Sequence, residues 1–318
     1  MHSGQDAKQL HEELTYAYDA AGNKAMESLP PDGAFAALTT TYTYDDLNRL
    51  IQLTTMQASS TTPVLQETYI LNLDGSPASE SGAGAGQTYQ WNYDPDGRLV
   101  MRMGDLGVYT YGYDLVGNRV SDTVPAGSST DMDIYTYDAR NEQTGQSTYN
   151  VDYTDSGVEY DLLSTVADMY DANGSLTSSV LTPVSGSATT TTYGYDVRNK
   201  LTTVSVNGNL QATYLYDDNG NRVQETVGST TTFYLTDHAN PTGYAQPVEE
   251  WSSGGGSRSL VRTYFIGQRV FGQWDSSDGV LLLLADGHGS TVAYLDSAGD
   301  ETGLTYDPFG DRKGVGFP

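Results

Sequence analysis

One stretch decides the fold: Tyr214-Leu215-Tyr216-Asp217-Asp218-Asn219-Gly220-Asn221-Arg222-Val223. Residues two apart in a β-strand lie on the same face, so Tyr214 and Tyr216 are expected to point the same way. Gly220 can adopt a positive φ, and the Asp217 carboxylate can accept hydrogen bonds from the amides of a turn. The apolar residue that follows Arg222 opens a returning strand. The stretch therefore predicts one two-stranded hairpin with a tight turn.

The same pattern recurs along most of the chain. Where successive copies are adjacent, their aspartates lie about 20 to 26 residues apart, which is typical of one supersecondary unit per repeat. The sequence therefore predicts an all-β protein, an array of antiparallel β-hairpins that form a curved or spiralling sheet with negligible helix. The copies are Tyr16/Tyr18/Asp19, Tyr42/Tyr44/Asp45, Tyr111/Tyr113/Asp114 with Gly117 in its turn, Tyr135/Tyr137/Asp138, Tyr193/Tyr195/Asp196, Tyr214/Tyr216/Asp217 and the tryptophan variant Trp91/Tyr93/Asp94.

Some stretches depart from this pattern. Pieces rich in Thr, Ser, Gly and Ala at 79–87, 125–130 and 185–192 are expected to be variable loops or second turns. Two units, at 69–76 and 149–161, have lost part of the motif. An array tolerates such losses because the neighbouring repeats still cover the edges.

The repeat changes character near residue 233, which predicts two parts. Residues 1–232 form the hairpin array, and residues 233–318 form a second set of repeats that ends in Tyr306-Asp307-Pro308-Phe309-Gly310. The longest apolar run, 280–285, has the length of one buried strand. The opening residues lack the apolar core of a signal peptide, and no stretch reaches membrane-spanning length.

The charge balance excludes several kinds of partner. There are 41 Asp plus Glu against 15 Lys plus Arg, a formal net charge of -26. Such a surface repels phosphate backbones and anionic membranes, so we expect neither nucleic-acid binding nor membrane insertion. The chain has no Cys, which excludes disulfides and thiolate sites but leaves the compartment open.

These motifs resemble the YD-repeat family, which includes Rhs proteins, the shell-forming component of bacterial insecticidal toxin complexes, wall-associated bacterial proteins and the animal teneurins. The most specific parts are the Tyr-x-Tyr-Asp-x-x-Gly-Asn-Arg units, then Asp286-Gly287-His288-Gly289-Ser290, and finally the segment with Asp307, Pro308 and Gly310. This order looks like the last part of an Rhs core. In that family Asp-Pro-Phe-Gly lies upstream of a separate self-cleavage site, so self-cleavage is not carried onto Asp307.

The resemblance implies a structural role and no enzymatic activity. In the family, a long sheet of hairpins spirals into a hollow shell, often around a toxin or other C-terminal cargo. We therefore expect a scaffold segment of a secreted or surface-exposed bacterial protein, whose partners are other segments of a larger parent protein or copies of itself. A self-assembling surface fibre and, with less support, a self-cleaving protein are the alternatives within this class.

A carbohydrate- or cell-surface-binding module is the alternative from another class. Exposed tyrosine rings can stack on sugars while their hydroxyls form hydrogen bonds. Cross-strand aromatic pairs, however, stabilise a sheet by roughly 0.2–1 kcal/mol each, which explains the repetition without a ligand. No Gly-x-Ser-x-Gly elbow marks a nucleophile.

Metal and cofactor sites are not expected. The four histidines, His2, His11, His238 and His288, lack metal-ligand spacing, and His288 between two glycines indicates a turn. The turn that begins at Asp217 superficially resembles a calcium loop but lacks the closing bidentate acid, so ordinary turn hydrogen bonding is favoured over adventitious calcium.

Overall fold

The computed structural model describes residues 14–31, 35–58, 60–84, 86–105, 107–126, 129–154, 157–254, 257–310 and 312–313. Within these residues every regular element is a β-strand. Twenty-five strands form one sheet, and two short strands form a second. The predicted all-β array of antiparallel hairpins is confirmed. The described residues contain no helix that is long and apolar enough to cross a membrane.

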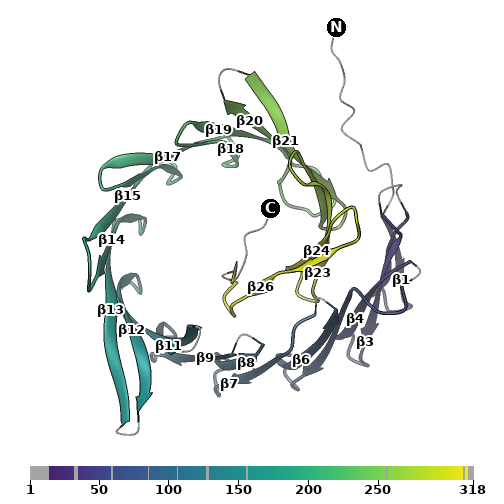
Figure 1. Cartoon of the computed structure of the whole chain (residues 1–318), viewed down its shortest axis with the longest axis horizontal. Coiled ribbons are helices and arrows are strands. Elements are labelled where there is room, and N and C mark those ends of the chain that lie inside the picture. The colour runs from purple at the N-terminus through teal and green to yellow at the C-terminus, as the bar shows by residue number, and fades with distance from the viewer. Residues whose placement is uncertain are drawn as a thin grey trace. The chain divides into compact units, whose positions relative to one another are not determined.

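The strands follow one another closely along the chain (Figure 1). The first thirteen are β1 (Thr15–Tyr18), β2 (Lys24–Leu29), β3 (Leu38–Tyr44), β4 (Leu50–Gln57), β5 (Leu65–Leu71), β6 (Pro77–Gly84), β7 (Tyr89–Tyr93), β8 (Leu99–Gly104), β9 (Gly107–Tyr113), β10 (Arg119–Ala126), β11 (Ser129–Tyr137), β12 (Gln143–Thr154) and β13 (Gly157–Tyr170).

The remaining strands continue the same order. They are β14 (Leu176–Pro183), β15 (Thr189–Tyr195), β16 (Leu201–Val206), β17 (Asn209–Tyr216), β18 (Arg222–Val227), β19 (Thr230–Asp237), β20 (Gln246–Gly254), β21 (Ser257–Ile266), β22 (Val270–Asp275), β23 (Gly279–Ala285), β24 (Thr291–Leu295), β25 (Glu301–Gly303), β26 (Thr305–Tyr306) and β27 (Arg312–Lys313).

Consecutive strands pair antiparallel, and the register shifts by one residue beside most of the motif turns. In the β3–β4 pair, Tyr42 lies opposite Leu53, but the register slips between Thr43 and Tyr44. The same slip occurs in β1–β2, β11–β12, β13–β14, β15–β16 and β17–β18. An extra residue in one strand is a β-bulge, which increases the local right-handed twist. Each of these repeats therefore contributes one turn and one bulge.

Parts of all three predicted loops are strands. Residues 125–126 belong to β10, residues 129–130 belong to β11 and residues 189–192 belong to β15. The longest such part is in the first predicted loop. Residues 79–84 belong to β6, in which Glu80 pairs with Tyr69 of β5. The small residues of this stretch have low intrinsic strand preference, but β-propensity depends strongly on what lies next to the strand. Pairing with β5 overrides the local composition here, so the prediction of a loop is wrong for residues 79–84.

The chain divides into two compact units. Unit 1 comprises residues 1–90, 236–250 and 260–318, and unit 2 comprises residues 91–235 and 251–259. Figure 1 shows the strands of unit 2 side by side in a single curved layer. The two units are defined by which residues contact one another in space, whereas the predicted boundary near residue 233 marks a change in the type of repeat. The division into units therefore does not test that boundary, which stays a prediction.

Unit 1 has a second layer, because its late strands β23 and β24 pack against its early strands β2 to β5. A cluster of buried side chains joins β23 and β24 to the strands from β2 to β5. Leu53 and Ala293 are completely inaccessible to solvent. The predicted buried strand at 280–285 is thus β23, whose Leu281, Leu282, Leu283 and Leu284 are all buried. The cluster consists of Leu29, Phe35, Leu38, Leu53, Leu65, Tyr69, Leu282, Leu284, Val292, Ala293 and Leu295.

Candidate functional site

The recurring turn is organised by its aspartate. At Asp45 the carboxylate accepts hydrogen bonds from the amides of Leu47 and Arg49, both at 2.9 Å. The Asn48 amide donates to the Asp45 carbonyl at 3.0 Å, and Asn48 has a φ of 59°. Hydrogen bonds to the charged form, led by the Arg49 side chain, lower the pKa of Asp45. The aspartate therefore acts as the internal brace of the turn, which we call the corner.

The same corner recurs through the chain. In each case the carboxylate accepts from backbone amides, and a residue three positions later has positive φ. Glycine takes this left-handed conformation without the strain that a Cβ causes, and asparagine tolerates it. The corner aspartates are Asp19, Asp45, Asp94, Asp114, Asp138, Asp171, Asp196, Asp217, Asp286 and Asp296, and the third positions are Gly22, Asn48, Gly97, Gly117, Asn141, Gly174, Asn199, Gly220, Gly289 and Gly299.

The final motif forms a related turn. The Gly310 amide donates to the Asp307 carbonyl at 3.1 Å, and the Asp307 carboxylate accepts from the Phe309 amide at 2.9 Å. Pro308 occupies the position where a fixed φ near −65° suits a turn. A further corner, with Asn72 in place of aspartate, joins β5 to β6 at the first of the two altered units.

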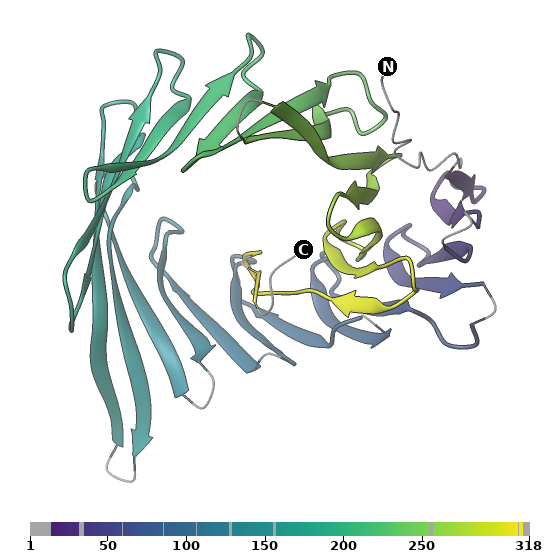
Figure 2. The ribbon, with the colours of Figure 1, turned by 45° about the horizontal axis from the view of Figure 1, so that its top comes forward.

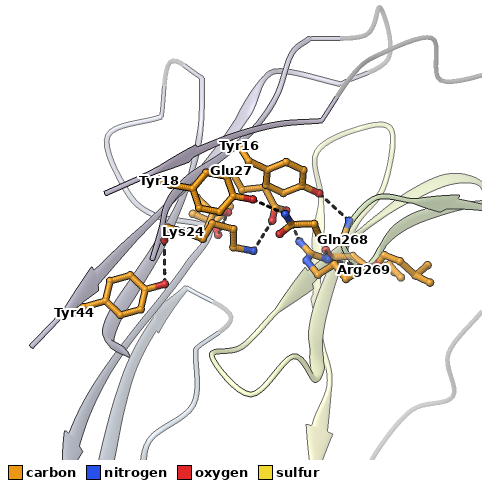
Figure 3. Close-up of polar contacts among 11 residues, drawn as sticks. Tyr16, Tyr18, Lys24, Glu27, Tyr44, Gln268 and Arg269 are labelled. Carbon is orange, nitrogen blue, oxygen red and sulfur yellow. Dashed lines mark hydrogen bonds and ion pairs between the residues drawn. The ribbon is translucent and has the colours of Figure 1, made fainter. Parts of the chain in front are cut away.

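In most repeats the second tyrosine of the motif joins the repeat to the one before it. Its hydroxyl donates to the carbonyl five residues beyond the preceding corner aspartate, a contact that we call the tyrosine lock. In Figure 3 the hydroxyl of Tyr44 reaches the carbonyl of Lys24 at 3.0 Å. The other locks are Tyr113 to Leu99 at 2.8 Å, Tyr137 to Arg119 at 2.7 Å, Tyr170 to Gln143 at 2.9 Å, Tyr195 to Leu176 at 2.9 Å and Tyr216 to Leu201 at 2.8 Å.

The locks occupy tyrosine hydroxyl groups that would otherwise be available to bind a ligand. Burial raises the pKa of the locking tyrosines, including Tyr44 and Tyr137, so they stay protonated donors. Tyr170 belongs to this set, although its motif has Asp168 where the first tyrosine would stand. The Tyr-Asp pair followed by Ala-Asn-Gly is the signal that identifies it. Tyr93 and Tyr193 are half-buried in β7 and β15.

The first tyrosines take part in a different contact, a cation held between two rings. The guanidinium of Arg119 lies 5.9 Å from the ring centre of Tyr111 and 5.2 Å from that of Tyr135. Asp122 is the ion-pair partner at 3.5 Å, and its carboxylate also accepts from the Tyr135 hydroxyl at 3.1 Å. This arrangement combines cation–π attraction with a partly buried charge pair.

The same cluster occurs three times at fixed offsets. The cation stands five residues after the corner aspartate, and the acid stands eight residues after it. We call these the cation clusters. They are Lys24 between Tyr16 and Tyr42 with Glu27, Arg119 between Tyr111 and Tyr135 with Asp122, and Arg222 between Tyr214 and Tyr234 with Glu225. Sequence reasoning missed the acids, although their constant spacing from the aspartate was a readable signal.

In unit 1 the first cation cluster is covered by another part of the chain (Figure 3). The turn between β21 and β22 places Arg269 on the Glu27 carboxylate at 2.9 Å. The Gln268 amide donates to the Tyr16 hydroxyl at 3.0 Å, and its side chain donates to the Tyr18 hydroxyl at 2.5 Å. These contacts attach the edge strand β1 to a hairpin about 250 residues later.

A second polar contact secures the two layers of unit 1. The Tyr69 hydroxyl donates to Glu67, which is completely buried, and accepts from the Gly287 amide at 2.8 Å. Burial raises the pKa of Glu67, and the negative charge of Asp286 raises it further; burial also raises the pKa of Asp286. His288 lies edge-on to the Tyr69 ring at 5.8 Å, in the corner that Asp286 braces.

The structural comparison relates this fold to part of a larger chain. No family model and no curated protein matches the sequence. A crystal structure of TcdB2-TccC3-Cdc42 superposes on 95% of this chain with a TM-score of 0.50 and 14% identity. The chain has the fold of a segment of TcdB2-TccC3. It spans 18% of that chain, and it covers the same share of the Photorhabdus luminescens Tc holotoxin pore, with a TM-score of 0.48 and 16% identity.

The likeness to TcdB2-TccC3 confirms the resemblance predicted from the motifs, at the level of the fold. It extends over nearly the whole chain, so it includes both units. His238 is exposed in the turn that follows β19, while His2 and His11 lie outside the described residues. Among the described residues, no three His, Asp or Glu side chains are grouped to hold a metal ion.

Proposed function

We propose that this chain is a wall segment of a larger bacterial YD-repeat protein of the Rhs type, which is secreted or displayed at the cell surface and encloses a toxin or other cargo. The observation that carries the proposal is the likeness in fold over 95% of the chain to 18% of a TcdB2-TccC3 chain. A chain that matches about a fifth of a larger protein is suited to forming one stretch of a longer wall.

The repeat geometry suits a wall. Each corner fixes the turn of its own hairpin, and each tyrosine lock fixes the spacing to the preceding hairpin. Neither contact needs a ligand, so hairpins can be added without a new kind of interaction. Because stability in such arrays sums over repeats and their neighbour contacts, a long sheet can hold its form without a thick core.

The locks also bear on the glycan-binding alternative. A sugar-binding tyrosine needs an exposed ring with an available hydroxyl. The hydroxyls of Tyr113, Tyr137 and Tyr216 are instead donated to backbone carbonyls of the preceding repeat. The repeated tyrosines therefore support the wall more strongly than they support a glycan surface.

Protease protection tests this function. In the protein in which the chain occurs naturally, the enclosed cargo should resist trypsin while the wall is intact. Replacing the three locking tyrosines Tyr113, Tyr137 and Tyr216 with phenylalanine should make the cargo cleavable. Cargo that is digested equally fast with the native wall, or images that show an extended fibre without an enclosed volume, would reject the proposal.

A further inference from the structure

One hairpin of unit 2 is longer than its neighbours. Strand β12 has 12 residues and β13 has 14, and Figure 2 shows both extending beyond the adjacent strands. They pair with each other as far as Thr154 and Gly157. On its other side β13 pairs with β14 only from Ser164 to Tyr170. The Leu163 carbonyl accepts from the Val184 amide at 2.8 Å, which is the last contact on that side.

The result is an open strand edge. In the part of the chain that the structure describes, no strand pairs with residues 157–162 on the side away from β12. Every residue from 157 to 163 is exposed. A strand edge with free backbone groups is a template for a further strand, and proteins use such edges to bind extended peptides.

The two faces of this edge differ in character. Val158, Tyr160 and Leu162 lie on one face, opposite Tyr153, Val151 and Tyr149 of β12. On the same face, Met132, Ile134, Tyr149 and Tyr160 line a pocket of about 300 Å³. A strand added beside β13 would therefore extend an apolar surface that is already formed.

The other face is acidic. Glu159 stands directly opposite Asp152, and Asp161 stands opposite Asn150. Like charges directly opposite each other destabilise a sheet. No basic residue nearby in the sequence can neutralise this repulsion, because there are eight Asp or Glu and no Lys or Arg between Arg140 and Arg198. A cation supplied from outside would stabilise this face.

We propose that the open edge of β13 binds an extended polypeptide by β-strand addition, and that this partner alternates apolar with basic residues. Its backbone would pair with residues 157–162, its apolar side chains would continue the surface at Tyr160, and its Lys or Arg side chains would meet Glu159 and Asp161. The alternation follows from the pleat, which sends successive side chains to opposite faces.

A second copy of this chain does not fit the same edge. An antiparallel copy with Tyr160 paired to itself keeps the apolar side chains on one face and places Glu159 opposite Asp161, acid against acid. The net charge of -26 adds long-range repulsion between copies. The same charges attract a cationic partner.

Fluorescence anisotropy with a labelled peptide of alternating valine and lysine tests the proposal. The double variant Glu159→Lys/Asp161→Lys should weaken binding at least about tenfold, because two attractive contacts become repulsive. The matched control Asp46→Lys/Asp218→Lys changes two exposed acids of two corners and the net charge equally. It should weaken binding less than about twofold at physiological salt.

Hydrogen exchange distinguishes strand addition from simple attraction. The peptide should slow exchange at residues 157–162, and a peptide N-methylated at alternate residues should lose this effect. Equal weakening by both double variants, or binding without protection at 157–162, would overturn the proposal. Absence of binding would also overturn the proposal. Glu159 and Asp161 would then serve to prevent edge-to-edge aggregation of the sheet.

Discussion

The two units use the same repeat but are stabilised differently. Among the residues that the structure describes, nineteen hydrophobic side chains are buried, and fifteen of them belong to unit 1. The four described in unit 2 are Tyr109, Tyr111, Val151 and Ala212. Unit 1 buries a leucine-rich layer beneath β23 and β24, whereas unit 2 depends on corners, locks and cation clusters. The motif residues therefore set the spacing between hairpins, whereas the hydrophobic core is formed mainly by residues outside the motif.

The largest expected effect is on the core of unit 1. Leu53→Ala removes a side chain with no solvent exposure and should lower the free energy of unfolding of unit 1 by about 2–5 kcal/mol. Urea unfolding can be followed at Trp274 alone in a chain that also carries Trp91→Phe and Trp251→Phe, because those two tryptophans belong to unit 2.

The control for this prediction is Leu235→Ala, at a side chain of unit 2 that is 53% exposed. It should change stability by no more than about 0.5 kcal/mol. Leu53→Ala is also made in a chain that keeps Trp91 and Trp251 and carries Trp274→Phe. If the unfolding transition at Trp91 and Trp251 then shifted as far as it does at Trp274, the two units would unfold together and would not differ in stability.

The second prediction concerns pH. Burial raises the pKa values of Glu67 and Asp286 in the folded chain, so the folded chain binds these two protons more tightly than the unfolded chain does. The stability that the bound protons contribute is fully present at a pH below the pKa values of the unfolded chain. It is lost as the pH rises through the folded values. Unit 1 should therefore lose stability from acidic toward alkaline pH, measured at Trp274 by urea titration.

Glu67→Gln should reduce this dependence, because the amide needs no proton to remain neutral when buried. At alkaline pH the variant should be more stable than the native chain by roughly 1–3 kcal/mol, the usual cost of a buried polar atom without a hydrogen bond, which is the state of Glu67 Oε1. Asp46→Asn, at an exposed carboxyl of the same unit, is the control and should keep the native slope. A native slope in Glu67→Gln would contradict the role of Glu67.

The sequence could predict whatever is local to a repeat. The aspartate brace, the left-handed third position and the alternation of Tyr214 and Tyr216 all follow from residues within one hairpin. The packing of β23 on Leu53 and Tyr69 could not be predicted, because those residues are more than 200 positions apart and an apolar run does not identify its partner. The length of β13 was also missed, although its outer part, residues 158–162, alternates apolar with acidic residues as a strand does.

A smaller effect is expected from the locks of unit 2. Tyr137→Phe removes only the hydroxyl that donates to the Arg119 carbonyl at 2.7 Å, and it should cost about 0.5–1.5 kcal/mol, the net value of one hydrogen bond. Tyr153→Phe is the matched control, because Tyr153 is 75% exposed near the end of the long hairpin. Unfolding followed at Trp91 and Trp251 should separate the two, and equal stabilities would mean that the lock contributes nothing.

The smallest effect tests whether the cation clusters add to an ordinary ion pair. Arg222→Met keeps the length of the side chain but loses the charge that lies 5.4 Å from the Tyr214 ring centre and 5.2 Å from that of Tyr234. The expected loss is about 0.5–1 kcal/mol, because the guanidinium is largely exposed. Arg140→Met loses the ion pair with Glu142 at 2.6 Å from a corner and should cost no more than about 0.5 kcal/mol. If both variants lost the same amount, the rings would contribute nothing, and the recurrence of the cation would reflect charge pairing alone.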